Sequence, residues 1–109
     1  MPFVGSIDQG TTSTRFILFD HDGAIISSAQ QEFKQYLPHE GQCEHDPEEI
    51  WRTVQYCVKE SLSSTNPKNT LQRTIALEEI TCVGITNQRE TTIVWDRNTG
   101  KPFYNALVW

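Results

Sequence analysis

Hydroxyl side chains gather in one segment near the start of the chain, residues 8–15, which reads DQGTTSTR. Gly10 lets the backbone approach a ligand closely, the hydroxyls and neighbouring amides can donate to phosphate oxygens, and Arg15 adds positive charge. Asp8 can hold a hydrated Mg²⁺ ion. The segment lacks the Gly-Lys-Ser/Thr of a Walker A loop and runs into an apolar strand, so it predicts a phosphate-binding hairpin. Composition alone is equally compatible with a turn whose hydroxyls, those of Thr11, Thr12, Ser13 and Thr14, bond their own backbone.

A second polar cluster, Asn87-Gln88-Arg89-Glu90, directly follows an apolar run. The guanidinium of Arg89 can donate to one hydroxyl of a polyol while the Glu90 carboxylate accepts from another, and such contacts are strongest where water is excluded. The same two residues are also typical of a surface ion pair at a strand end, which contributes little to stability. The cluster therefore predicts either a polyol site or a solvated strand end.

Three short runs in the first third of the chain, residues 3–8, 15–19 and 24–33, have the β-branched and aromatic content of strands. Short loops join them, and the second loop is a turn at residues 20–23 with the sequence DHDG. Connections this short cannot make a parallel crossover. The three runs therefore predict an antiparallel meander.

The clearest helix in the sequence begins after Asp46 and stops at Asn66-Pro67. Asp46 is suited to cap it, Pro47 to be its first residue, and Glu49 to return a hydrogen bond to the backbone of the cap. Apolar residues at helical spacing predict one buried face that packs on a sheet, and these are Ile50, Trp51, Val54, Cys57, Val58 and Leu62.

Residues 80–86, ITCVGIT, form a nearly continuous apolar run that is typical of a strand buried on both faces. Residues 91–95 and 103–109, joined by the turn DRNTG, predict a hairpin. Because the chain stops inside this last apolar run, and an exposed apolar edge is a liability, we expect the natural fold to continue past residue 109.

Parallel pairing of residues 3–8 with residues 80–86, with the helix in the crossover, would bring both polar clusters to one edge of the sheet. Ligands of open α/β sheets bind at the edge where the carboxyl ends of the parallel strands meet. The segments 9–14 and 87–90 are therefore expected to face a common crevice.

The charge balance, nine Lys and Arg against fourteen Asp and Glu, gives a net charge of −5 and argues against binding to duplex nucleic acid. No apolar run approaches the ~20 residues of a membrane-spanning helix, and the N-terminus has no signal-peptide pattern, which predicts a cytoplasmic protein without a membrane span. The three widely spaced cysteines, Cys43, Cys57 and Cys82, suit reduced packing thiols better than disulfides or a zinc site.

Aromatic and histidine side chains outside the two clusters give weaker signals. Trp51, on the apolar face of the helix, is predicted to lie in the core. Trp95 and Trp109 end strand-like runs, where a ring either walls a small-molecule pocket or simply packs. His45, next to the helix cap, is interpreted as a local hydrogen-bonding group.

Three ordered motifs, DQGTTSTR, GQCEHDPEEIW and GITNQRETTIVWDRNTGKPFYNALVW, together resemble the FGGY family of carbohydrate kinases, and within it the members that phosphorylate glycerol. The resemblance covers essentially all 109 residues, so residues 1–109 would be the N-terminal part of the N-terminal domain of such a kinase. It implies an α/β fold, the ribonuclease-H-like fold of actin-like ATPases, in incomplete form. The elements would be the three-stranded antiparallel meander, a crossover helix, a parallel strand and then a hairpin.

The resemblance also implies transfer of the γ-phosphoryl group of ATP to a terminal hydroxyl of glycerol, assisted by Mg²⁺. On the nucleotide side, Asp8 matches the acid near the metal, and the positions around the phosphates are matched by Gly10, Thr11, Thr12, Ser13 and Arg15. On the acceptor side, Arg89 and Glu90 match residues that bind glycerol hydroxyls, and Trp109 matches an aromatic wall against the carbon chain.

The sequence departs from the family pattern at Gly41-Gln42-Cys43, where the family usually has Gly-Trp-Val. The catalytic Asp of the family, its second phosphate loop and its adenosine site all lie beyond residue 109, so we expect no catalytic residue in this chain and little activity from the chain alone. Three alternatives stay open, namely another polyol or sugar as acceptor, a non-catalytic module that binds a partner, and an actin-like or chaperone-like ATPase. A homo-oligomer at full length is compatible with each kinase reading.

Overall fold

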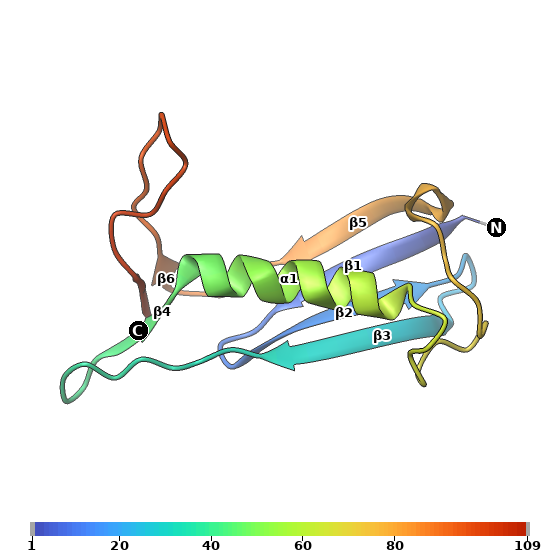
Figure 1. The fold of residues 1–109 in the computed structure, drawn as a ribbon, viewed down its shortest axis with the longest axis horizontal. Helices are drawn as coiled ribbons and strands as arrows, with labels where there is room; N and C mark the ends of the chain where they lie inside the picture. Colours follow the sequence, from blue (N-terminus) through green and yellow to red (C-terminus); the bar gives the residue numbers. More distant parts are fainter. Residues whose placement is uncertain (1, 109) are drawn as a thin grey trace.

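The structure is a computed structural model that describes residues 2–108. Within these residues the chain forms two sheets, one long helix and a 3₁₀ turn, and Figure 1 shows the helix lying along one face of the larger sheet. In chain order the elements are β1 (Phe3–Gln9), β2 (Ser13–Phe19), β3 (Ile25–Glu32), β4 (Cys43–His45), α1 (Pro47–Ser61), η1 (Leu77–Glu79), β5 (Ile80–Thr86), β6 (Thr91–Thr92) and β7 (Ala106–Val108).

The larger sheet has the strand order β3-β2-β1-β5. Strands β1, β2 and β3 pair antiparallel, which confirms the predicted meander. Strand β5 pairs parallel with β1, in a register that sets Asp8 opposite Thr86, and α1 lies in the connection between the meander and β5. The predicted crossover is therefore confirmed, and β1 and β5 end at the same edge of the sheet.

The start of α1 follows the prediction in part. The Asp46 side chain accepts a hydrogen bond from the backbone N–H of Glu48 at 3.0 Å, and Pro47 is the first helical residue. The predicted return bond from Glu49 to the cap is wrong, because the segment after β3 offers this carboxylate two other donors. Glu49 accepts from the backbone N–H of Lys34 at 2.8 Å and from the Tyr36 hydroxyl at 3.1 Å, which ties the helix start to that segment.

The face that α1 turns to the sheet is made of small side chains. Thr53, Cys57 and Ser61 are the buried residues of the helix, and α1 packs on β2 and β3. The Thr53 hydroxyl lies 2.6 Å from that of Thr14 on β2, and the Ser27 hydroxyl on β3 donates to the carbonyl of Ser61 at 2.6 Å. Small side chains that bond across the interface let the helix lie close to the strands.

The prediction that Trp51 lies in the core is wrong, since 56% of this residue is exposed. Because α1 sits over β2 and β3, the larger apolar side chains beside its buried face point along the helix flank instead. Ile50, Val54 and Val58 are only partly buried, and with Trp51 they line an open groove over β1 and β5.

The core lies between the larger sheet and α1. Its buried members come from β1, β2, β3, α1 and the connection to η1, and they are Phe3, Phe16, Leu18, Ala29, Cys57, Leu62 and Ile75. Gly5 on β1 makes room for the Phe16 ring on β2, because a Cβ atom at Gly5 would lie 2.6 Å from the ring. Phe16 can therefore cross over the backbone of its neighbouring strand.

Strand β5 is not buried on both faces, so that prediction is wrong. In the described residues β5 pairs with β1 alone and forms an edge of the sheet, and α1 does not extend over it. Val83 is 44% exposed and Ile85 is 73% exposed. Strand β5 therefore has the apolar sequence of a buried strand, but its outer edge and its faces are exposed in the described residues.

The smaller sheet has the order β4-β7-β6, all antiparallel. The pairing of β6 with β7 and the bridge between Trp95 and Pro102 confirm the predicted hairpin. Strand β4 was not expected. It begins at Cys43, the last residue of the departure at 41–43, and Gly41 there adopts the left-handed φ of +78° that favours glycine. Trp95 lies outside the strands of this sheet and is 56% exposed.

No helix in the described part of the chain is both long and apolar enough to cross a membrane. All three cysteines are free thiols, but the prediction that all three are packing residues is wrong for Cys82. Their environments differ, because Cys57 is buried in the core whereas Cys82 is exposed on β5.

These environments predict selective thiol labelling. Burial raises the pKa of the Cys57 thiol to about 11, so at pH 7.5 it has almost no thiolate and no access to reagent. A disulfide reagent added to the 109-residue chain is expected to modify Cys82 rapidly and Cys57 only after unfolding in urea. Mass spectrometry of the labelled peptides measures both rates, and a Cys82→Ser variant identifies the fast site. Equal labelling of Cys57 and Cys82 without denaturant would contradict the packing of α1.

Candidate functional site

The two predicted clusters lie at one edge of the larger sheet. The hairpin between β1 and β2 holds the hydroxyl segment, and the turn after β5 holds Arg89 and Glu90. Because β1 and β5 are parallel neighbours, these connections leave the sheet side by side, at the end toward the smaller sheet in Figure 1. The expected convergence on one rim is confirmed for the backbone.

The hydroxyl segment forms a tight turn. The Gly10 N–H donates to the carbonyl of Ser13 at 3.0 Å, and a Cβ atom at Gly10 would lie 3.0 Å from that same oxygen. The Thr11 and Thr12 hydroxyls have no hydrogen-bond partner among residues 2–108. These two hydroxyls are therefore available to a ligand.

The other two hydroxyls of the segment are engaged by side chains. Ser13 accepts a hydrogen bond from the Gln30 amide at 2.9 Å. Thr14 turns inward, where its hydroxyl contacts that of Thr53 and donates to the side-chain Oε1 of Gln9 at 3.1 Å. The alternative of a turn whose hydroxyls bond their own backbone does not describe this segment.

Asp8 and Arg15 face each other across β1 and β2. The Arg15 Nη2 lies 3.8 Å from the Asp8 Oδ2, and both side chains are about half exposed. No cluster of three or more metal-ligating side chains occurs in the part of the chain that the structure describes. A lone carboxylate suits Mg²⁺, which usually keeps several waters and takes its remaining ligands from phosphate oxygens. Asp8 thus fits the role of one protein ligand to a magnesium ion that is also bound by phosphate oxygens.

The turn after β5 presents both of its charged side chains to solvent. Arg89 and Glu90 are exposed, and neither side chain makes a hydrogen bond or ion pair within residues 2–108. Glu90 has a φ of +57°, the left-handed region that a residue other than glycine rarely adopts. Such strain is concentrated at binding sites, where the surrounding structure imposes it. Trp109, the third predicted substrate residue, lies outside the described residues.

A hydrogen-bonded chain that the sequence did not predict joins the two clusters. The His45 Nε2 lies 2.6 Å from the Gln35 Oε1, and the His45 Nδ1 lies 2.8 Å from the Gln88 Nε2. Gln35 donates to the backbone carbonyl of Thr11 at 3.1 Å, and Gln88 donates to the Thr91 hydroxyl at 2.9 Å. We call Gln35, His45 and Gln88 the central relay.

His45 is fully buried, and its ring meets Phe33 edge to face with centroids 4.8 Å apart. Burial lowers the pKa of His45, and the Gln88 contact and the Glu49 carboxylate only partly offset this effect. The neutral imidazole therefore prevails, with Nε2 donating to Gln35 and Nδ1 accepting from Gln88. His45 is a hydrogen-bonding group, as interpreted, but the interpretation of its bonding as local is wrong, because its partners lie 10 and 43 residues away in the sequence.

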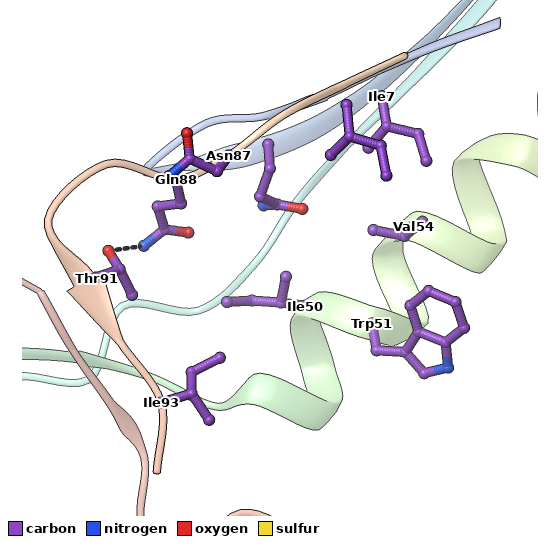
Figure 2. A pocket seen from close by; sticks show the side chains of 10 residues that line it. Ile7, Ile50, Trp51, Val54, Asn87, Gln88, Thr91 and Ile93 are labelled. Atoms are coloured by element: carbon purple, nitrogen blue, oxygen red, sulfur yellow. Dashed lines mark hydrogen bonds between the residues drawn. The ribbon is translucent and has the colours of Figure 1, made fainter. Parts of the chain in front are cut away.

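A cavity of about 350 Å³ lies beside the relay, between α1 and the ends of β1 and β5. Figure 2 shows its apolar wall at Ile7, Ile50 and Val54, and a polar end at Gln88 and Thr91. The side-chain amide oxygen of Gln88, Oε1, is buried and has no hydrogen-bond partner in the described chain. Gln9, Asn87 and Gln88 line this cavity, whereas the predicted nucleotide and polyol residues lie outside it on the rim.

The sequence pattern offered one signal for Gln88, which is its place directly after an apolar strand. Nothing local marked Gln35, which lies in an irregular segment between β3 and β4. Its role depends on the meeting of Tyr36 with Glu44, whose backbones exchange hydrogen bonds at 2.9 and 2.8 Å.

Comparison with known proteins decides the family. Residues 3–109 match the FGGY family of carbohydrate kinases, N-terminal domain. The chain belongs to this family. Among curated FGGY relatives, the glycerol kinase of Carboxydothermus hydrogenoformans is 54% identical over 107 residues, and that of Petrotoga mobilis is 51% identical over 107 residues. Both matches cover 98% of this chain and 20% of the relative, so the chain spans about a fifth of the length of these FGGY proteins.

Solved structures of FGGY kinases have the same fold. A crystal structure of Plasmodium falciparum glycerol kinase with ADP is 42% identical, with a TM-score of 0.84, and the match covers 100% of this chain and 20% of that one. A ligand-bound xylulose kinase from Lactobacillus acidophilus is 21% identical with a TM-score of 0.80, covering 100% of this chain and 20% of that one. This second likeness shows the fold alone.

The buried neutral His45 predicts a pH dependence of stability. Its pKa is lowered in the folded state, so as pH falls below the ordinary value of about 6.5 the unfolded chain takes up a proton first. The free energy of unfolding is therefore expected to decrease from pH 7.5 to pH 5.5, as measured by urea denaturation. His45→Gln removes this titration and is expected to flatten the slope, whereas His39→Gln, at an exposed position, leaves it unchanged. A wild-type slope that His45→Gln preserves would contradict the assignment.

Proposed function

We propose that these 109 residues belong to an ATP-dependent kinase that phosphorylates glycerol and releases sn-glycerol 3-phosphate. The observation that carries this proposal is the arrival of two polar clusters at one rim of the sheet, one with free hydroxyls and one with a free guanidinium and carboxylate. The chain is 51% and 54% identical to two proteins named glycerol kinase, which supports glycerol as the acceptor.

On the nucleotide side, we assign phosphate contacts to the turn between β1 and β2. The free hydroxyls of Thr11 and Thr12 would donate to phosphate oxygens, with Ser13 and the close backbone at Gly10 completing the turn. Arg15, half exposed beside Asp8, would add a positive charge. ATP supplies the phosphoryl group, and these residues would orient its phosphates and neutralise their charge. Catalysis of phosphoryl transfer consists mainly of such positioning and charge stabilisation.

Asp8 is the residue that would hold Mg²⁺, through one carboxylate oxygen or a bound water. Its pairing with Arg15 is loose, at 3.8 Å with both groups about half exposed, so the carboxylate keeps oxygen lone pairs free. The ADP in the Plasmodium falciparum structure supports a nucleotide in this family.

On the acceptor side, Arg89 would donate to one glycerol hydroxyl and Glu90 would accept from another. Two charged groups of opposite sign with complementary donor and acceptor roles suit a small uncharged polyol, because each hydroxyl both donates and accepts. We place Trp109 against the carbon chain of the substrate. A general base would come from residues that lie outside these 109, and the reaction would take place in the cytoplasm, where thiols such as Cys43, Cys57 and Cys82 stay reduced.

The test is a coupled assay of ADP release by the full-length protein over a panel of glycerol, xylulose and gluconate. Glycerol is expected to give the highest kcat/KM, and the chain of residues 1–109 alone is expected to give no turnover above background. A higher kcat/KM with xylulose or gluconate than with glycerol would show that the protein is a kinase with a different acceptor. Absence of ADP release with any acceptor would overturn the proposal and favour a module that binds a partner.

Substitution of Arg89 separates the two sides of the site. Arg89→Ala in the full-length protein removes a charge-assisted hydrogen bond to the acceptor, so the KM for glycerol is expected to rise about tenfold or more. The KM for ATP is expected to change less than about twofold. Arg97→Ala, at an exposed position in the hairpin turn, is the matched control and should alter neither constant. An equal rise in both KM values would count against the assigned role.

A further inference from the structure

We propose that His45 is a positioning residue that holds two turns in a fixed relation to each other. They are residues 9–14 between β1 and β2, called the phosphate turn, and residues 87–90 after β5, called the polyol turn. His45 does so through the central relay, with one ring nitrogen assigned to each turn. Nε2 binds Gln35, which donates a hydrogen bond to the Thr11 carbonyl of the phosphate turn. Nδ1 binds Gln88, which immediately precedes Arg89 and Glu90.

The relay is continuous from one turn to the other. Starting at the phosphate turn, the distances are 3.1 Å from the Gln35 Nε2 to the Thr11 carbonyl oxygen, 2.6 Å from the Gln35 Oε1 to the His45 Nε2, and 2.8 Å from the His45 Nδ1 to the Gln88 Nε2. A last contact of 2.9 Å joins the Gln88 Nε2 to the Thr91 hydroxyl, which itself donates to the Arg89 carbonyl at 3.2 Å. Each end of the relay therefore holds backbone next to a ligand-binding side chain.

Burial makes the relay stiff. His45 is fully buried, Gln88 is 8% exposed, and Phe33 packs edge to face on the imidazole ring. A buried donor or acceptor that loses its partner suffers the full cost of desolvation, so the contacts resist breaking. The ring also has no spare nitrogen, because a neutral imidazole offers one donor and one acceptor and both are used.

The link matters because the two turns belong to elements that the sheet alone aligns only as far as Asp8 and Thr86. Beyond these residues β1 and β5 are no longer paired, and the turns would be free to move apart. In-line transfer depends on the distance between the phosphoryl donor and the acceptor hydroxyl, where an error of about 1 Å is costly. The relay supplies a side-chain contact between the turns at the point where backbone pairing ends.

This inference rests on the proposed function in one respect, which is that the two turns bind nucleotide and polyol. The test uses His45→Asn and His45→Gln in the full-length protein. The Asn side chain places its oxygen near the position of Nδ1 and so keeps the acceptor for Gln88, whereas Gln places its amide near Nε2 and keeps the donor for Gln35. Both variants lose the ring contact with Phe33, so each is the packing control for the other.

The two variants are expected to fail on opposite sides of the site. His45→Asn releases the phosphate turn and should raise the KM for ATP about fivefold, with the KM for glycerol changed less than about twofold. His45→Gln releases the polyol turn and should show the reverse pattern. His39→Asn and His39→Gln, at an exposed loop position, should change neither constant. If the two His45 variants change neither kcat nor either KM value, or raise both KM values equally, the inference is wrong.

Amide hydrogen exchange of the same variants gives a readout that does not depend on activity. His45→Asn should speed exchange in peptides that contain residues 10–14 and spare residues 87–92, and His45→Gln should do the opposite. This pattern in a protein that phosphorylates no acceptor would overturn the proposed function and leave the positioning role intact. Uniform or absent change in exchange, in a protein that is an active glycerol kinase, would overturn the positioning role alone.

Discussion

Parallel pairing of β1 with β5 is the interaction on which the rest of this structure depends. It brings residues separated by most of the chain to one edge, since the register sets Asp8 opposite Thr86. Except for Trp109, the residues assigned to ligand binding lie close to these two positions in the sequence. Without the pairing, the hydroxyl turn would be a surface hairpin and Arg89 and Glu90 would be a solvated strand end.

The helix α1 runs back along one face of the sheet on a surface of small residues, and it returns the chain to the end of the sheet where β1 and β5 both begin. Thr53, Cys57 and Ser61 let α1 lie close on β2 and β3. The Thr53 hydroxyl, the Cys57 thiol and the backbone carbonyl of Ser61 form hydrogen bonds across the interface. The larger apolar side chains are left on the flank, where they form the wall of the cavity beside Gln88. Packing of the helix thus shapes the space next to the central relay.

Most of the sequence predictions that succeeded, other than the parallel crossover, rest on local signals. Asp46 and Pro47 mark the helix start by their own chemistry, and the short loops of the meander permit only antiparallel pairing. The predictions that failed concern which side chains and strands are covered by neighbouring elements. Trp51 was assigned to the core because periodicity gives an apolar face and not its rotation on the sheet, and β5 was assigned to a buried position because its composition does not show which neighbours this chain provides. The contact of His45 with Gln88 spans 43 residues, and no local pattern encodes it.

A crystal structure of the full-length protein with ADP, Mg²⁺ and glycerol tests the central claim most directly. The account predicts that the diphosphate contacts the Thr11 and Thr12 hydroxyls, that glycerol contacts Arg89 and Glu90, and that both ligands share one cleft at the carboxyl ends of β1 and β5. Electron density for either ligand at the opposite edge of the sheet, away from these side chains, would contradict it.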